Sequence, residues 1–327
     1  MLSFQELSVL FDQKFNQRLF PQEPPALYDA ASYILDLGGK RIRPLLCLMG
    51  NELFNDISPD AYHVATAIEL FHNFTLIHDD IMDKAPLRRG KPTVHKQFNE
   101  PTALLAGDVM LVKVYEYLNK IDSIYIHKII DIFNKMAREV CEGQQIDMML
   151  EQRNFSDADN TVSMDEYLHM ITLKTSVLLG ASLQCGAILG GAGKGNQDLI
   201  YDFGKNIGIA FQVQDDYLDA FGNPEKFGKQ PAGDIIANKK TFLLLRALDT
   251  ADTDQKDRLL KLMQGDGNEK VSGLLQLYRE CNVEQWAVDL KQRYMDQAMA
   301  DLEEIAVLSS RKTKLRELAE FLLNRDT

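Results

Sequence analysis

The stretch Leu76-Ile77-His78-Asp79-Asp80-Ile81-Met82-Asp83 ends an apolar segment with three carboxylates. The acids occupy positions i, i+1 and i+4, and on an α-helix the i and i+4 side chains share one face, about 6 Å apart along the axis. A second pentad, Asp215-Asp216-Tyr217-Leu218-Asp219, repeats this spacing. One such pentad alone is better explained as a solvated acidic helix end. Two of them indicate paired oxygen ligand sets for a cation.

Placing these acids at helix ends is unfavourable unless something compensates them. Each acid near a helix C-terminus opposes the helix dipole by about 0.3–1 kcal/mol. Neighbouring carboxylates also disfavour one another's ionisation. A hard divalent cation that prefers oxygen ligands offsets both effects, and Mg²⁺ fits that description.

Outside the pentads, helical periodicity prevails and no convincing alternating strand is found. We therefore predict an all-α fold, and since no linker interrupts the chain, a single domain over residues 1–327. Glycine- and proline-containing breaks follow both pentads, at Lys84 to Pro101 and Gly222 to Asn238. The helices are expected at Leu27 to Leu37, Tyr62 to Asp83, Thr102 to Leu118, Ile124 to Glu151, Met164 to Leu189, Gln197 to Phe221, Lys240 to Leu248, and most of Val283 to Leu323.

Composition narrows the class of protein. The 327 residues are 45% hydrophobic, enough for a large core, and the formal net charge of −12 argues against a nucleic-acid or anionic-membrane binder. Four dispersed cysteines and no evident signal peptide predict a cytoplasmic protein with reduced thiols. The uncharged run Ser176 to Gly193 is rich in glycine and contains Gln184, so we expect a buried helix and not a membrane span.

Clustered cations accompany the carboxylates. Gly38-Gly39-Lys40-Arg41-Ile42-Arg43-Pro44 places three cations after a glycine pair, which suits a phosphate-type anion, although a solvated helix start is equally consistent with it. Arg88-Arg89-Gly90-Lys91 follows the first pentad, which favours an anion site. His72 lies seven residues before Asp79, on nearly the same helical face, but taken alone it is better explained as a histidine of the core. The parts together indicate an apolar cavity that binds two diphosphates with apolar tails.

The sequence resembles the trans-isoprenyl diphosphate synthases of the polyprenyl synthetase family, because these motifs follow one another along the chain in the same order as in that family. The resemblance spans Gly38 to Thr241 and implies an all-α bundle of antiparallel helices of the isoprenoid synthase type around a deep central apolar pocket. It also implies a homodimer, three Mg²⁺ ions, and head-to-tail condensation of isopentenyl diphosphate with an allylic diphosphate. Besides the pentads and the basic clusters, the matching motifs are Ala106-Gly107-Asp108, Gly143-Gln144, Lys174-Thr175, Phe211-Gln212-Val213-Gln214 and Lys239-Lys240-Thr241.

The resemblance also assigns roles to residues. Direct metal ligands would be Asp79, Asp83 and Asp215, with Asp80, Asp216 and Asp219 as secondary members. The isopentenyl diphosphate site would comprise Lys40, Arg43, His72 and Arg89. The allylic diphosphate site would comprise Arg88, Lys174, Lys229 and Lys239. Thr175, the amide of Gln212 and the carbonyl of Lys174 would stabilise the allylic cation. A metal role for Asp234 is left open, because the chain departs from many relatives around Gln230 to Asp234.

Product length is expected to depend on Phe74 and Thr75, which lie about one helical turn before Asp79. This pair resembles the short-chain pattern of archaeal-type geranylgeranyl diphosphate synthases, so we predict a twenty-carbon product, with the fifteen-carbon farnesyl product as the alternative. A class I terpene cyclase would not need Lys40, Arg43 and a second pentad. A non-catalytic regulatory subunit would be free to lose ligands, whereas every key carboxylate and cation is present here.

Overall fold

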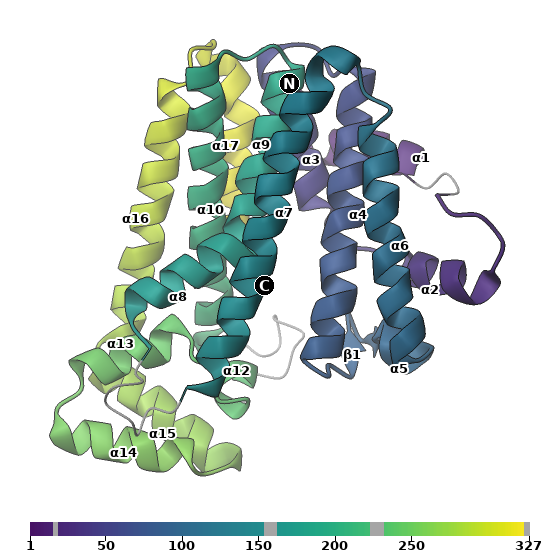
Figure 1. The fold of residues 1–327 in the computed structure, drawn as a ribbon. Coiled ribbons are helices and arrows are strands. Elements are labelled where there is room, and N and C mark those ends of the chain that lie inside the picture. Colours follow the sequence, from purple (N-terminus) through teal and green to yellow (C-terminus); the bar gives the residue numbers. More distant parts are fainter. Residues whose placement is uncertain (16–18, 154–161, 223–231, 324–327) are drawn as a thin grey trace. The chain divides into compact units, whose positions relative to one another are not determined.

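A computed structural model describes residues 1–15, 19–153, 162–222 and 232–323 of the chain. Within these ranges nearly all regular structure is helical (Figure 1), which confirms the predicted all-α class. The helices are α1 (Phe4–Phe15), α2 (Pro25–Asp36), α3 (Ile42–Phe54), α4 (Pro59–Met82), α5 (Val94–Gln97), α6 (Glu100–Leu118), α7 (Ser123–Gln152), α8 (Met164–Ile171), the π-helical turn η2 (Thr172–Ser176), α9 (Val177–Leu189), α10 (Lys194–Phe221), α12 (Gly233–Ile236), α13 (Phe242–Thr250), α14 (Thr253–Met263), α15 (Gly267–Glu280), α16 (Val283–Glu304) and α17 (Ser309–Leu323).

A short hairpin lies in the break that follows the first pentad. Strand β1 (Leu87–Arg88) pairs antiparallel with β2 (Lys91–Pro92). The two connecting residues, Arg89 and Gly90, have φ of 53° and 75°. Positive φ at both positions is what a tight two-residue hairpin turn requires. The sequence analysis treated this segment only as a break, because strands of two residues are too short to show an alternating pattern.

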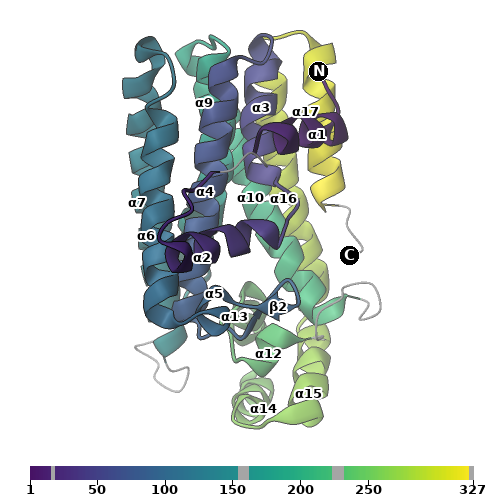
Figure 2. The same cartoon turned by 90° about the vertical axis from the view of Figure 1, so that its right-hand side faces the viewer.

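Contacts divide the chain into two compact units. Unit 1 comprises Met1–Lys135, Ala181–Tyr201 and Ile305–Lys314, and unit 2 comprises Met136–Gly180, Asp202–Glu304 and Leu315–Thr327. In unit 1, α4 and α6 lie side by side (Figures 1 and 2). In unit 2, buried side chains of α13 and α15, among them Phe242 and Leu277, belong to one apolar core. The first pentad lies in unit 1 and the second in unit 2. The assignment of residues 1–327 to one domain stays a prediction.

The segment Met164–Leu189, which runs through α8, η2 and α9, is long and apolar enough to cross a membrane, with a mean hydropathy of 1.3. However, 78% of its most apolar window is buried inside the protein. A membrane span would expose its apolar side chains to lipid, whereas these pack against the chain itself. The segment is therefore a core helix, as the polar and glycine content of Ser176 to Gly193 predicted.

Candidate active site

The first pentad forms the end of α4. The helix ends at Met82 with Asp83 as its C-cap, because Lys84 turns into the left-handed region with φ of 51°. Lys84 N–H then donates to the Ile81 carbonyl at 3.2 Å, and Ala85 N–H donates to the Asp80 carbonyl at 3.0 Å. Such a left-handed residue satisfies the last carbonyls of a helix. The carboxylates therefore lie on a fixed last turn and not on a frayed end.

The acids of this pentad lie in different surroundings. Asp80 is 2% exposed, and its two oxygens accept hydrogen bonds from Nε and Nη2 of Arg88 at 2.7 and 2.8 Å. This is the bidentate geometry in which a guanidinium binds a carboxylate most strongly. Asp79 is half-buried and Asp83 is exposed. Arg88, which the resemblance assigns to the allylic diphosphate, thus contacts Asp80 in this structure.

Two contacts involve residues of the basic clusters, one between Arg89 and Gly39 and one between Arg43 and His72. The φ of Gly39 is 147°, a value that residues with side chains rarely adopt, and a Cβ there would lie 2.9 Å from Nη2 of Arg89. Arg43 Nη1 lies 3.1 Å from Nε2 of His72. Burial and the neighbouring arginines, Arg43 first, hold the pKa of His72 well below its usual range. The imidazole is therefore neutral and accepts a hydrogen bond from Arg43.

Arg41, the cation between Lys40 and Arg43 in the sequence, binds a buried carboxylate. Its backbone is left-handed, with φ of 49°, and its guanidinium donates to Glu69 at 2.5 Å and to the Leu35 carbonyl at 2.9 Å. Glu69 is 3% exposed and also accepts from the Asn73 amide at 2.8 Å. A buried carboxylate retains its charge only when it is paired in this way. The pair ties the loop that carries Lys40 to helix α4, and the sequence analysis did not identify Glu69.

Phe74 is part of an aromatic row on α4. Its ring centroid lies 5.7 Å from that of Phe71 and 4.7 Å from that of His78. Phe71 in turn makes an edge contact with Phe133 of α7 at 5.2 Å. Phe74 is held on both sides and remains only half-buried, whereas Thr75 donates its hydroxyl back to the His72 carbonyl at 2.8 Å.

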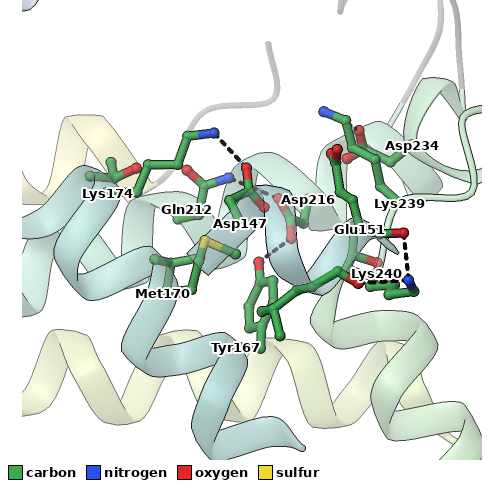
Figure 3. Close-up of a pocket in the computed structure, with 14 residues that line it drawn as sticks. Asp147, Glu151, Tyr167, Met170, Lys174, Gln212, Asp216, Asp234, Lys239 and Lys240 are labelled. Carbon is green, nitrogen blue, oxygen red and sulfur yellow. Dashed lines mark hydrogen bonds and ion pairs between the residues drawn. The ribbon is translucent and has the colours of Figure 1, made fainter. Parts of the chain in front are cut away.

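Unit 2 contains a pocket of about 140 Å³ (Figure 3). The lining includes Lys174, Thr175, Gln212, Asp216 and Lys239 from the predicted site. It also includes residues that the sequence analysis did not assign. These are Asp147, Leu150, Glu151, Tyr167, Met170, Ile171, Asp234, Lys240 and Thr241.

Lys174 pairs with Asp147, whose Oδ2 lies 2.5 Å from its Nζ (Figure 3). The lysine belongs to η2, a π-helical turn of a kind that often occurs at functional sites. Helix α7 approaches this turn closely at Gly143, where a Cβ would lie 2.3 Å from the Lys174 nitrogen. The glycine of the Gly143-Gln144 motif is thus required by packing, and the Lys174 side chain lines the pocket.

Gln144 gives a prediction about stability. It is 7% exposed, and neither its amide oxygen nor its nitrogen has a hydrogen-bond partner among the described residues. An unsatisfied buried polar group costs about 1–3 kcal/mol, so we expect Gln144→Met to leave the free energy of unfolding unchanged or to raise it. Gln184, 8% exposed, is a matched control because its amide donates to the Gln197 carbonyl at 3.2 Å, and Gln184→Met should destabilise. Urea unfolding measures both variants, and equal destabilisation would contradict the argument.

Asp216 is the inward-facing acid of the second pentad. Its carboxylate is 6% exposed and accepts hydrogen bonds from the Tyr167 hydroxyl at 2.5 Å and the Gln212 amide at 2.9 Å (Figure 3). Burial first, and then the negative charges of Asp234 and Asp215, raise the pKa of Asp216 to about 7 despite these hydrogen bonds. A cation in the site would offset this repulsion.

The raised pKa predicts how the stability of the metal-free protein depends on pH. The folded protein binds the Asp216 proton more tightly than the unfolded chain does, so this group's contribution is present below about pH 4 and is lost as pH rises through 7. We expect the stability of Asp216→Asn to fall less between pH 4 and 8 than the stability of the wild-type protein. Thermal unfolding in a chelator between pH 4 and 8 measures the difference, and identical pH slopes for the two proteins would contradict the prediction.

The last acid of the second pentad supports a loop. An oxygen of Asp219 accepts from the Asp234 N–H at 2.9 Å, and its carbonyl accepts from the Ala232 N–H at 2.8 Å. These bonds hold the start of α12. Asp234 then presents its own carboxylate to Lys239, with Oδ1 3.2 Å from Nζ, and raises the pKa of Lys239 against the opposing effect of burial. Asp234, left open by the sequence analysis, thus lies in the pocket.

The donor chemistry of both carboxylate clusters fits Mg²⁺, since all the candidate ligands are oxygens. Among the described residues, no three His, Cys, Asp or Glu side chains form a ready-made metal-binding group. Mg²⁺ characteristically takes one or two carboxylates and completes its shell with water and substrate phosphates. The clusters are therefore suited to a metal that arrives with a diphosphate. Lys229, a predicted allylic ligand, lies outside the described residues.

Three comparisons place the chain among known proteins. The polyprenyl synthetase family model matches residues 24–281. A short chain isoprenyl diphosphate synthase of Methanocaldococcus jannaschii is 41% identical over 270 residues, which cover 80% of each chain. A geranylgeranyl diphosphate synthase of Sulfolobus acidocaldarius is 36% identical over 92% of this chain and 91% of its own. A crystal structure of a geranylgeranyl pyrophosphate synthase, 41% identical, matches with a TM-score of 0.92 over 100% of both chains, which confirms the isoprenoid synthase type of fold.

Proposed function

This chain belongs to the polyprenyl synthetase family, and we propose that it synthesises geranylgeranyl diphosphate. It is a short-chain trans-prenyltransferase, and members of the family act on isopentenyl and allylic diphosphates with divalent metal ions. The proposed part is the twenty-carbon product. It is supported by the half-buried Phe74 in its aromatic row, and farnesyl diphosphate is the alternative.

We assign isopentenyl diphosphate to unit 1, where Lys40, Arg43, His72 and Arg89 would bind it. The contact of Arg43 with a neutral His72 supports this assignment, as does the close approach of the Arg89 guanidinium to Gly39. An imidazole that stays neutral here adds no charge of its own and fixes the direction of the Arg43 guanidinium. Arg41 is not part of this set, and its guanidinium binds the buried Glu69.

We assign the allylic diphosphate to the carboxylates and the remaining cations. Three Mg²⁺ ions would neutralise the leaving diphosphate when bound, which lowers the barrier to ionisation. Asp80 accepts a hydrogen bond from Arg88, and Asp216 accepts one from Tyr167. Because both carboxylates already have partners, these contacts support secondary roles in metal binding for both. The direct metal ligands would be Asp79, Asp83 and Asp215, with Asp219 secondary. The diphosphate ligands would be Arg88, Lys174, Lys229 and Lys239.

The same side chains account for the chemistry. Lys174 and Lys239 act where negative charge develops on the leaving group. The amide N–H of Gln212 donates a hydrogen bond to Asp216. Its amide oxygen remains to stabilise the allylic cation, together with Thr175 and the Lys174 carbonyl. The double bond of isopentenyl diphosphate attacks this cation, and the released diphosphate takes the final proton. The single observation that carries the proposed chemistry is the unit 2 pocket, where Lys174, Gln212 and Asp216 come together.

The test is to incubate the purified protein with Mg²⁺, isopentenyl diphosphate and, in turn, dimethylallyl, geranyl and farnesyl diphosphates. Mass spectrometry should show a twenty-carbon endpoint. A fifteen-carbon endpoint would keep the reaction and replace the proposed product. A cyclic hydrocarbon would instead indicate a cyclase, and no turnover with any primer would indicate a regulatory subunit.

We also propose a homodimer in the cytoplasm. All four cysteines are free thiols, in keeping with a reducing compartment. Helix α6 exposes an apolar face, with Leu104, Leu105 and Val112 exposed by 49%, 57% and 59%, and such faces often mark protein contacts. We expect Val112→Lys to yield monomers in analytical ultracentrifugation. Val288→Lys, at a 40% exposed valine of α16, is the control and should leave the mass unchanged. A wild-type monomer would contradict the proposal.

A further inference from the structure

The adjacent lysines Lys239 and Lys240 have opposite environments. The Lys239 side chain is 55% exposed and pairs with Asp234, whereas Lys240 is 9% exposed. The backbone between α12 and α13 is non-helical here, and Thr241 is extended, with φ of −69° and ψ of 161°. Both side chains line the pocket, and their ammonium groups point in different directions (Figure 3).

The Lys240 ammonium binds the end of α7. Its Nζ donates to the Glu151 carbonyl at 2.7 Å (Figure 3). It also donates to the Leu150 carbonyl at 2.6 Å and to the Arg153 carbonyl. An ammonium has three donors, and here the three are used on carbonyls at a helix C-terminus. The Leu150 and Glu151 carbonyls lie in the last turn of α7, at the negative end of the helix dipole, and the Leu150 carbonyl also accepts from the Arg153 N–H at 3.2 Å. A buried lysine is stable at this position because the carbonyls replace the water it has lost.

Through Arg153, the Lys240 ammonium is also connected to segments that carry other pocket residues. Arg153 donates to Glu166 at 2.8 Å, and Glu166 belongs to the capping box that starts α8. Tyr167 follows directly and binds Asp216. One ammonium thus connects the last turns of α7, which carry Asp147 and Glu151, with the segment of Lys239 and, through Arg153, with the start of α8.

We propose that Lys240 is a positioning residue that holds Lys239 and the C-terminal turns of α7 in place for the allylic diphosphate. This inference rests on the function proposed above. Lys240 does not touch the substrate, because its three donors already bind backbone carbonyls. Its effect passes through Lys239, and the two lysines should behave as one unit.

The experiment is a double-mutant cycle of Lys239→Met and Lys240→Met, with the KM of each substrate as the readout. We expect Lys240→Met to raise the KM of the allylic diphosphate by about tenfold or more, as loss of an orienting contact commonly does. The KM of isopentenyl diphosphate should change by less than about twofold, and the double variant should match Lys239→Met within the same limit. Lys240→Arg keeps a cation for the carbonyls and should restore part of the loss.

Arg311→Met is the control. Arg311 donates to the Glu52 and Leu53 carbonyls at 3.3 and 3.2 Å, so it also binds a helix C-terminus, but in unit 1. It should lower the melting temperature without changing either KM. Unchanged KM values for Lys240→Met, equal increases for both substrates, or effects of the two lysine variants that multiply would each overturn the inference.

Binding of inorganic pyrophosphate with Mg²⁺, measured by calorimetry, separates this inference from the proposed function. If the wild-type protein shows no turnover, the proposed function fails, yet pyrophosphate binding still reports on the coupling of the two lysines. Weaker binding by Lys240→Met, with the double variant binding no more weakly than Lys239→Met, would support the inference. Unchanged binding would overturn it.

Discussion

Asp79→Asn is expected to lower kcat/KM for the allylic diphosphate by about 10²–10³-fold, the range found when a preorganised group that stabilises transition-state charge is removed. The substitution keeps the size of the side chain and removes the charge that would hold Mg²⁺ and the leaving diphosphate. Asp79 lies on a last turn of α4 that Lys84 and Ala85 close with backbone hydrogen bonds, so the loss should not come from fraying. Steady-state kinetics over a range of Mg²⁺ concentrations measure it, and half-maximal activity should require more Mg²⁺.

The adjacent acid should behave differently. Asp80→Asn breaks the bidentate contact with Arg88 in a buried position and should cost about 1–3 kcal/mol of stability. Asp79→Asn should leave the melting temperature nearly unchanged. Asp131→Asn, at an exposed carboxylate of α7, is the control for charge loss alone and should alter neither activity nor stability. If Asp79→Asn kept most of the wild-type activity, the assignment of Asp79 as a metal ligand would be wrong.

Phe74→Ala is expected to shift the product from the twenty-carbon endpoint to longer chains. The ring is held between Phe71 and His78, so it cannot turn aside when a growing chain reaches it. Its removal opens space on the order of one isoprenyl unit. The loss of a half-buried ring should cost about 1–3 kcal/mol, so the protein is expected to remain folded. Chromatography of the dephosphorylated products gives the chain-length distribution.

Two substitutions at Thr75 complete the test. Thr75→Ala removes few atoms, and the hydroxyl it deletes bonds to the His72 carbonyl of the same helix, so the distribution should change little. Thr75→Phe adds a ring one turn below Asp79 and should shorten the product. An unchanged distribution in Phe74→Ala would show that the limit to chain length lies elsewhere.

Each predicted helix overlaps helices of the structure because helical periodicity depends on neighbours three and four residues apart, which the sequence displays directly. Lys240 was wrongly placed in a helix, since α13 begins at Phe242. The start of α4 is shifted to Pro59 from the predicted Tyr62, since Ser58 caps the helix through a hydrogen bond to Ala61 N–H at 3.2 Å. The hairpin at Leu87–Pro92 was missed because two-residue strands have no readable period. Family and reaction class followed from the order of the motifs, and the comparisons confirm both.

The sequence by itself determined the all-α class, the family and the residue types that carry the chemistry. Only the tertiary structure decided which partner each charged side chain meets. Lys174 pairs with Asp147 across 27 positions, and Tyr167 reaches Asp216 across 49. It also separated the roles of adjacent residues, since Lys239 pairs with Asp234 whereas Lys240 binds backbone carbonyls at the end of α7. The physical reason is that local spacing fixes the face of a helix on which a side chain lies, whereas packing between helices fixes what that face meets.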